Sequence, residues 1–144
     1  MIVYFDTSAL VKRYLRETDS DKVVALLNGS GHFFGSSVVA KVEMSAAFQK
    51  AVRMDIVSAA GAKEIWNDFL SHWQSFARLR VTEGTIERAS DIAWKHGLRG
   101  YDSLHLAAAM FWQETLGMQV LIAAFDRDLR RVSRLTGLEV WFPD

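Results

Sequence analysis

Two short apolar runs in this chain each end at an aspartate. The first covers residues 1–5 and stops at Asp6, and the second covers residues 120–125 and stops at Asp126. Short apolar runs of this kind predict strands that are buried on both faces of a sheet. A carboxylate at the end of a buried strand is costly to desolvate unless a positive group meets it. The two runs therefore predict core strands and suggest a divalent cation near their ends.

The rest of the chain alternates between strand and helix patterns. Further strands are expected at residues 32–36, 79–81 and 138–141, and helices at residues 8–16, 20–28, 38–54, 59–76, 82–96 (from Thr82 or Thr85), 101–116 and 128–135. Ser20 or Asp21 is expected to cap the second helix, and Ser36 or Ser37 the third. The alternation predicts an α/β fold, a three-layer α/β/α sandwich around a mainly parallel sheet of four to five strands. Ligands bind beyond the carboxyl ends of such strands, so Asp6 and Asp126 are expected at one edge.

Composition limits the class of protein and the chemistry of any metal site. The 144 residues are half hydrophobic with a single proline, which predicts one globular domain over residues 1–144. The chain has no cysteine, so a metal would bind oxygen or histidine, and oxygen ligands favour Mg²⁺ or Mn²⁺. The apolar start has no basic leader and no membrane span is expected, so we expect a cytoplasmic protein.

Charge gives no overall support for a nucleic-acid partner, because the formal net charge is +0. One local feature keeps the question open, namely the four arginines that follow Asp126 at helical spacing: Arg127, Arg130, Arg131 and Arg134. They form either a solvated helix face, with Asp128 as an ion-pair partner, or a patch that faces phosphate.

Two further acids have a route to the same sheet edge. Glu43 lies about two turns into the helix at residues 38–54, and its side chain can reach back toward the edge. Asp102 opens a helix that is otherwise nearly free of charge. Each acid alone has a structural explanation: Asp6 and Asp102 suit helix starts, and a single glutamate in an apolar helix often reaches solvent. Asp126 is favoured over Asp128 as the fourth acid because it ends the strand directly.

The ordered set of motifs resembles the PIN-domain family, in particular the VapC-type toxins of bacterial and archaeal toxin–antitoxin pairs. The matching pieces are residues 5–12 (FDTSALVK), Glu43, residues 101–109 (YDSLHLAAA) and residues 124–129 (AFDRDL). The resemblance implies a PIN-like doubly wound sheet, a metal-dependent ribonuclease that leaves a 5′-phosphate and a 3′-hydroxyl, a homodimer, and an antitoxin that inserts a peptide near the site. It implies catalytic roles for Asp6, Glu43, Asp102 and Asp126. One departure is Ser103, which stands where alanine is frequent.

We expect a division of labour among the four acids. Asp6 and Asp102 are the expected direct ligands of Mg²⁺ or Mn²⁺, while Glu43 and Asp126 bind through water or orient the attacking water. Hydroxyl groups, cations and one further acid near these residues are candidates for supporting the carboxylates or binding RNA phosphate: Thr7, Ser8, Ser103, Arg99, Arg127 and Asp128. His105 shares a helix face with Asp102 and is interpreted as a packing residue.

Three other functions compete with this interpretation. A receiver-like switch needs paired acids after the first strand and a late lysine, but Thr7 follows Asp6 and no lysine occurs after Lys95. A non-catalytic interaction module has no need for all four acids. A PIN-type nuclease that acts on DNA, or outside a toxin–antitoxin pair, shares the same chemistry and is separated only by experiment.

Overall fold

The computed structural model describes residues 1–143 and contains five strands and seven α-helices in that part of the chain. In chain order they are β1 (Ile2–Phe5), α1 (Thr7–Leu10), the 3-10 turn η1 (Val11–Arg13), α2 (Ser20–Asn28), β2 (Phe33–Ser37), α3 (Val39–Arg53), α4 (Ala59–Trp73), β3 (Ala77–Leu79), α5 (Glu83–His96), α6 (Gly100–Leu116), β4 (Val120–Ala123), α7 (Arg127–Leu135) and β5 (Glu139–Trp141).

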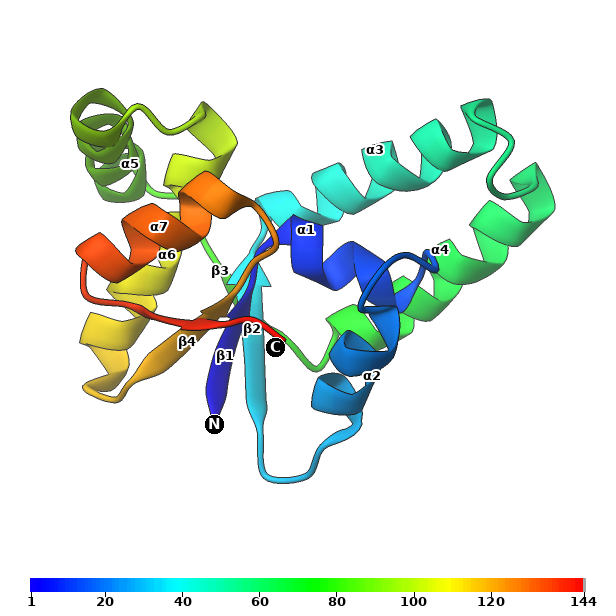
Figure 1. Ribbon diagram of the computed structural model, residues 1–144, viewed down its shortest axis with the longest axis horizontal. Helices are drawn as coiled ribbons and strands as arrows, with labels where there is room; N and C mark the ends of the chain where they lie inside the picture. The colour runs from blue at the N-terminus through cyan, green and yellow to red at the C-terminus, as the bar shows by residue number, and fades with distance from the viewer. Residues whose placement is uncertain (144) are drawn as a thin grey trace.

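The five strands form one parallel sheet in the order β3-β2-β1-β4-β5. The chain builds outward from β1 through β2 to β3, then returns to the other side of β1 and continues through β4 to β5. Helices α5, α6 and α7 lie on one side of the sheet and α1 to α4 on the other (Figure 1). The predicted three-layer sandwich is therefore confirmed, and the order of the strands reverses between β1 and β4.

The central position of β1 in the sheet explains why its sequence is apolar at every position. Its side chains alternate between two buried clusters: Val3 and Phe5 pack with α1 to α4, and Tyr4 packs with α5, α6 and α7. All three side chains are fully buried. A strand covered on both faces cannot carry polar residues on alternate positions, so the acid can appear only where the strand ends.

Several expected helix starts differ in the structure. The residue that precedes α2 is Asp19, in a left-handed conformation, and its side chain makes no capping hydrogen bond. Ser20, one of the two expected caps, is the first residue of the helix, and its hydroxyl accepts from the Glu17 backbone N–H. Helix α3 starts at Val39, whose N–H donates to Ser37 Oγ over 3.3 Å, so only Ser37 of the expected pair contributes there. The helix expected at residues 8–16 is shorter and divides into α1 and η1.

Helices α3 and α4 extend together beyond the rest of the molecule as an arm (Figure 1). An aromatic cluster packs the base of this arm, with the ring centres of Phe48 and Phe69 6.4 Å apart and those of Trp66 and Phe69 5.4 Å apart. Phe69 and Trp73 are buried there, whereas Trp66 is partly exposed. Within residues 1–143, no helix combines the length and the apolar character that crossing a membrane requires.

Candidate active site

A pocket of about 450 Å³ lies beyond the carboxyl ends of β1 and β4, where the strand order reverses. Parallel α/β sheets bind ligands at this place because helix starts and strand ends converge there. The pocket is lined by Asp6, Thr7, Ser8, Val11, Lys12, Glu17, Glu43, Arg99, Asp102, Phe125 and Asp126. All four acids predicted from the sequence therefore line one pocket.

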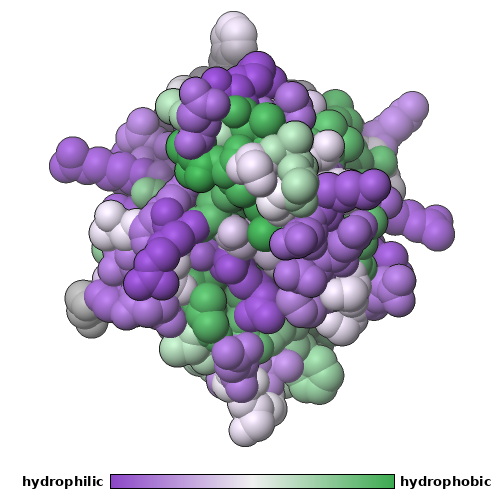
Figure 2. Space-filling view, turned by 90° about the vertical axis from the view of Figure 1, so that its right-hand side faces the viewer, coloured by the Kyte–Doolittle hydropathy of each residue, from purple (hydrophilic) through white to green (hydrophobic). Residues whose placement is uncertain are grey.

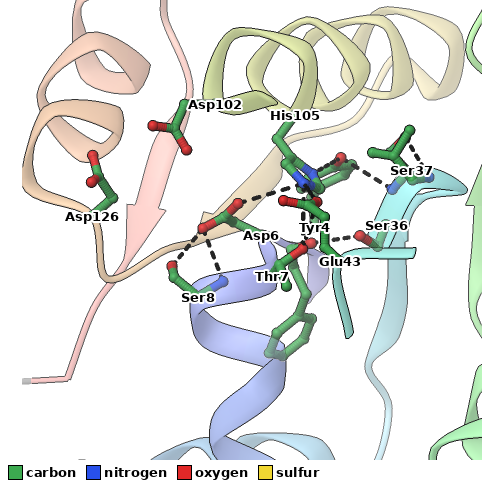
Figure 3. Close-up of polar contacts among 12 residues, drawn as sticks. Tyr4, Asp6, Thr7, Ser8, Ser36, Ser37, Glu43, Asp102, His105 and Asp126 are labelled. Atoms are coloured by element: carbon green, nitrogen blue, oxygen red, sulfur yellow. Dashed lines mark hydrogen bonds and ion pairs between the residues drawn. The ribbon is translucent and has the colours of Figure 1, made fainter. Parts of the chain in front are cut away.

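Asp6 occupies the centre of this arrangement, between Asp102 and Asp126 on one side and Glu43 and His105 on the other (Figure 3). It caps α1, and its Oδ2 accepts hydrogen bonds from the backbone N–H and the hydroxyl of Ser8. Only 4% of the residue is exposed. Capping and a role in the pocket are thus compatible, because Oδ1 points away from the helix start.

Ser8 connects the two strand ends that carry the acids. Its hydroxyl donates to Asp6 and accepts a 3.0 Å hydrogen bond from the backbone N–H of Phe125, just after β4. The Asp6 backbone N–H also donates to the carbonyl of Ala123 over 3.0 Å. These bonds hold the ends of β1 and β4 in a defined relation, which fixes the position of the Asp6 carboxylate.

Glu43 reaches the pocket from the first part of α3. It is the fifth residue of the helix, so it lies little more than one turn from the start instead of two. Its Oε1 accepts a 2.8 Å hydrogen bond from Thr7 Oγ1 and a 2.6 Å hydrogen bond from His105 Nε2. Two donors to one oxygen orient the carboxylate and stabilise its charged form.

The electrostatics of Glu43 and His105 follow from this contact. Burial raises the pKa of Glu43, but the hydrogen bonds from His105 and Thr7 and the charge of His105 outweigh it and hold the pKa below its usual value. Burial lowers the pKa of His105, but the hydrogen bond to Glu43 and the charges of Asp6, Glu43 and Asp102 leave it above its usual value. The pair therefore favours an ionised carboxylate beside a histidine that protonates readily.

Tyr4 sets the orientation of the His105 ring from the core side. Its Oη lies 2.7 Å from His105 Nδ1 and accepts a 3.1 Å hydrogen bond from the backbone N–H of Ser37. While His105 is neutral, the phenol proton can donate to Nδ1, which leaves the Nε2–H to donate to Glu43; when His105 is protonated, Nδ1–H donates to the phenol oxygen instead. Burial and the charge of Asp6 raise the pKa of Tyr4 well above its usual value, so the phenol keeps its proton.

His105 is the main residue that sequence interpretation missed. It is fully buried, as a packing residue would be, but both ring nitrogens are used in the network that reaches Glu43. The spacing of three residues from Asp102 placed it on the correct helix face. Its partners come from β1 and α3, so no local pattern could identify them.

Asp102 and Asp126 share one cation on the other side of the pocket. Arg99 Nε donates to Asp102 Oδ2 over 2.9 Å, and Arg99 Nη2 donates to Asp126 Oδ2 over 2.8 Å. Asp126 also caps α7, accepting from the Leu129 N–H over 2.8 Å. Asp102 lies in the first turn of α6 but makes no capping bond, so the capping explanation of this acid is wrong.

Burial and nearby negative charges both raise the pKa of Asp102. Burial raises its pKa first; the Arg99 hydrogen bond lowers it, but the charges of Asp6 and Asp126 add to the rise, and the pKa stays above its usual value. Side chains that differ in this way within one pocket suit different roles. Glu43 is stabilised as an anion, while Asp102 still lacks sufficient positive charge.

Three of the residues proposed in supporting roles lie away from the pocket lining. Asp128 is exposed and faces Arg131 Nε at 3.8 Å, and Arg127 is also exposed on α7. Ser103 is buried, and its hydroxyl has no hydrogen-bond partner among residues 1–143. Of the α7 arginines, Arg131 faces Asp128, the ion pair expected for a solvated helix face, and Arg130 donates to the Phe125 carbonyl over 2.7 Å.

Lys12 is a second pocket residue that sequence interpretation missed. Its Nζ lies 3.2 Å from Glu17 Oε2 and 2.9 Å from the carbonyl of Thr18, and it sits 4.4 Å from the centre of the Phe125 ring. The residue is 9% exposed. A lysine on the apolar start of a helix offered little signal beyond its place in the motif at residues 5–12.

The fold and the pocket together define an α/β protein with an acidic site at the switch point of a parallel sheet. Within that class, the chain belongs to the PIN-domain family, whose family model matches residues 3–135. Two similar relatives are Ribonuclease VapC45 and Ribonuclease VapC49 from two strains of Mycobacterium tuberculosis (CDC 1551 / Oshkosh and ATCC 25618 / H37Rv). Each is 33% identical over 142 residues, covering 96% of this chain and 94% of the relative.

Solved structures share the fold at lower sequence identity. The VapBC2 complex from Rickettsia felis, bound to a DNA fragment from its promoter, contains a chain with a TM-score of 0.68 and 13% identity, with 100% of both chains covered. PAE2754 from Pyrobaculum aerophilum has a TM-score of 0.62 and 21% identity, covering 97% of this chain and 83% of that one. These similarities support the architecture that the strand order already gives.

Proposed function

We propose that this protein is a metal-dependent endoribonuclease that acts as the toxin of a toxin–antitoxin pair, with residues 1–144 as a single PIN-like nuclease domain. The observation that carries the proposal is the convergence of Asp6, Glu43, Asp102 and Asp126 on one pocket at the β1–β4 switch point. Relatives named Ribonuclease VapC, at 33% identity across nearly the whole chain, support RNA as the substrate.

Nucleases of the PIN family generally depend on a divalent metal ion. In this chain, no three histidine, aspartate or glutamate side chains of residues 1–143 are gathered closely enough to hold an ion as they stand. The donor chemistry nevertheless fits, because the acids that line the pocket offer oxygen ligands, and burial together with the charges of Asp6 and Asp126 raises the pKa of Asp102. We assign Asp6 and Asp102 as direct ligands of Mg²⁺ or Mn²⁺. The bound ion would lower the pKa of a water molecule and neutralise charge in the transition state.

The protein groups supply orientation and phosphate binding. Glu43 is held by Thr7 and His105 in its charged form, which suits it to orient the attacking water. Asp126 is held at the start of α7 by its capping hydrogen bond and is the fourth predicted acid that lines the pocket. Among residues 1–143, the basic side chains that line the pocket are Lys12 and Arg99, and we assign phosphate binding to them in place of Arg127.

We also propose an antitoxin as partner, because the structural neighbours include toxin–antitoxin complexes from Rickettsia felis and Klebsiella pneumoniae. The arm of α3 and α4 offers a surface for it. Two adjoining hollows of about 380 and 520 Å³ share Ser45, Gln49 and Trp66, and Lys41, Arg53 and Lys63 stand at their borders. Viewed toward the end of the arm, apolar side chains gather between polar ones (Figure 2). Such a surface suits an amphipathic helix with acidic edges.

We further propose that the protein forms a homodimer and is located in the cytoplasm.

Cleavage of a mixed RNA pool tests the nuclease. Wild type should cleave in Mg²⁺ or Mn²⁺ and stop when EDTA is added. Asp6→Asn and Asp102→Asn should each lower the rate at least about 100-fold, since each removes a charged ligand at the reacting centre. Asp128→Asn is the matched control, because this exposed acid lies outside the pocket and its loss should leave the rate unchanged. Cleavage that survives EDTA, or both pocket substitutions, would exclude the metal–carboxylate mechanism. A DNA pool run in parallel separates a ribonuclease from a deoxyribonuclease.

Growth on expression tests the toxin assignment. Expression of wild type should arrest growth, and Asp6→Asn or Asp102→Asn should restore it at equal protein levels. Normal growth with the active enzyme would place the protein outside a toxin–antitoxin pair while leaving the nuclease assignment intact.

A further inference from the structure

Arg99 is placed where a metal ion would otherwise neutralise two of the acids. Its guanidinium donates a 2.9 Å hydrogen bond from Nε to Asp102 Oδ2 and a 2.8 Å hydrogen bond from Nη2 to Asp126 Oδ2. The same Asp102 is one of the two proposed direct ligands. The guanidinium and a divalent ion therefore compete for these carboxylates, because each contact with Arg99 occupies a lone pair of the oxygen and places a like charge beside any incoming ion.

Arg99 is also well placed to leave. Its side chain is 75% exposed, whereas that of Asp102 is 14% exposed. It lies in the short connection between α5 and α6, between the left-handed Gly97 and the first residue of α6, Gly100. Moving it into solvent breaks two ion pairs in which the cation is already largely exposed.

The pocket keeps excess negative charge even with Arg99 in place. Five acidic and two basic side chains line it, a formal excess of three negative charges. Of the two basic residues, Lys12 is buried and engaged by Glu17 and the Thr18 carbonyl, so it is not free to move toward Asp102. Arg99 is thus the cation that can exchange with an incoming one.

We propose that Arg99 is a built-in competitor of the catalytic metal, which holds Asp102 and Asp126 until a divalent ion displaces it. The inference rests on the proposed metal site, and it adds that the affinity of the pocket for metal is set by the displacement of Arg99. Removing Arg99 should therefore tighten metal binding, although it removes a contact to the ligand Asp102.

Calorimetric titration of Mn²⁺ into the whole protein tests this directly, with no activity measured. Arg99→Gln should bind Mn²⁺ about 3- to 10-fold more tightly than wild type, in keeping with the loss of two exposed ion pairs. Arg131→Gln removes the same charge from a residue that pairs with Asp128 outside the pocket, so it measures the general effect of charge. Arg99→Lys keeps the charge but cannot join both carboxylates, so its affinity should fall between those of wild type and Arg99→Gln.

A melting experiment separates competition from a structural role. In EDTA, Arg99→Gln should melt below Arg131→Gln, because Asp102 and Asp126 lose their shared cation; in saturating Mn²⁺ that difference should vanish. A deficit that is equal with and without Mn²⁺, or an Arg99→Gln affinity no tighter than that of Arg131→Gln, would overturn the proposal. Mn²⁺ binding that follows the expected order in a protein that cleaves no RNA would overturn the proposed nuclease and leave the competition standing. Failure of every variant to bind Mn²⁺ would overturn both.

Discussion

At the scale of single residues, each carboxylate in the pocket is distinguished by its partner. Glu43 is held by His105 and Thr7 and has a lowered pKa, whereas Asp102 has a raised pKa despite its contact with Arg99. Two acids whose pKa values move in opposite directions suit different tasks in one reaction. Glu43 stays an ionised, fixed carboxylate that can orient a water molecule, whereas burial and the neighbouring negative charges act together on Asp102.

The contact between His105 and Glu43 predicts a pH-dependent contribution to stability. The pKa of His105 is raised in the folded protein, so its contribution is full below the ordinary value of 6.5 and is lost as the pH rises through the folded pKa. The pKa of Glu43 is lowered, so its contribution is full above the ordinary value of 4.5 and is lost as the pH falls through the folded pKa. The two contributions overlap between these ordinary values.

His105→Gln isolates this effect, because glutamine can donate a hydrogen bond but does not titrate. Urea unfolding in EDTA should give a wild-type advantage of about 1 kcal/mol at pH 5.5 that declines above pH 7. A difference that is constant from pH 5 to 8.5 would show that the contact is not a titrating ion pair.

Ser103 predicts a stabilising substitution inside the motif. Its hydroxyl is buried without a partner, which costs free energy, so Ser103→Ala should raise the free energy of unfolding by up to about 1 kcal/mol and leave RNA cleavage unchanged. Ser133→Ala is the matched control, because Ser133 is also buried but donates to the Leu129 carbonyl over 2.7 Å. That control should lose about 0.5–1.5 kcal/mol. Loss of stability in both variants would contradict the assignment of Ser103.

At the scale of elements, the position of α6 on the sheet decides where Asp102 and His105 lie. Residues 103–109 of α6 are all buried. Trp112, further along the helix, is also buried, and its ring lies against Gly35 of β2. A Cβ at Gly35 would lie 2.7 Å from the Trp112 ring and 3.1 Å from the Ala77 carbonyl. Glycine at this position therefore allows the helix to approach the sheet.

Gly35→Ala should lower the free energy of unfolding by about 1–3 kcal/mol, as expected for overpacking against a buried ring. Gly84→Ala is the control, because Gly84 lies in α5 and its nearest atom would be at an ordinary 3.6 Å. Alanine is the better helix former, so that variant should gain up to about 1 kcal/mol. Chemical denaturation measures both, and an unchanged Gly35→Ala protein would show that α6 can shift without cost.

At the scale of the whole molecule, the switch point brings distant parts of the chain into one site. The pocket combines residues after β1, in α3, at the start of α6 and after β4. A ligand that binds this assembly and not the unfolded chain stabilises the entire fold by mass action.

Saturating Mg²⁺ or Mn²⁺ should therefore raise the melting temperature. At 100 times the dissociation constant the gain is about 2.7 kcal/mol, or roughly 5–10 °C for a chain of this size. Differential scanning calorimetry with and without EDTA measures it. Asp6→Asn should lose most of the shift while Asp128→Asn keeps it, and an equal shift in both would place the ion elsewhere.

Sequence alone determined the succession of strands and helices and the identity of the four acids. Strand β1 and helix α6 were predictable because their hydrophobic patterns are local and their surroundings are apolar on nearly every side. Asp6 and Asp126 were predictable because each directly ends an apolar run. The shortened helix after β1 and the start of α2 were not, since they depend on loop contacts such as that of Ser20 with Glu17.

Only the tertiary structure decided which side chain partners which acid. His105 is 62 residues from Glu43 and 101 from Tyr4, and Arg99 is 27 residues from Asp126. Contacts over such separations arise from the order of the strands and the packing of α6, and local periodicity contains no information about them. The sequence therefore determined that an acidic site exists at this edge of the sheet, while the fold decided that His105 orients one of its acids and Arg99 neutralises two others.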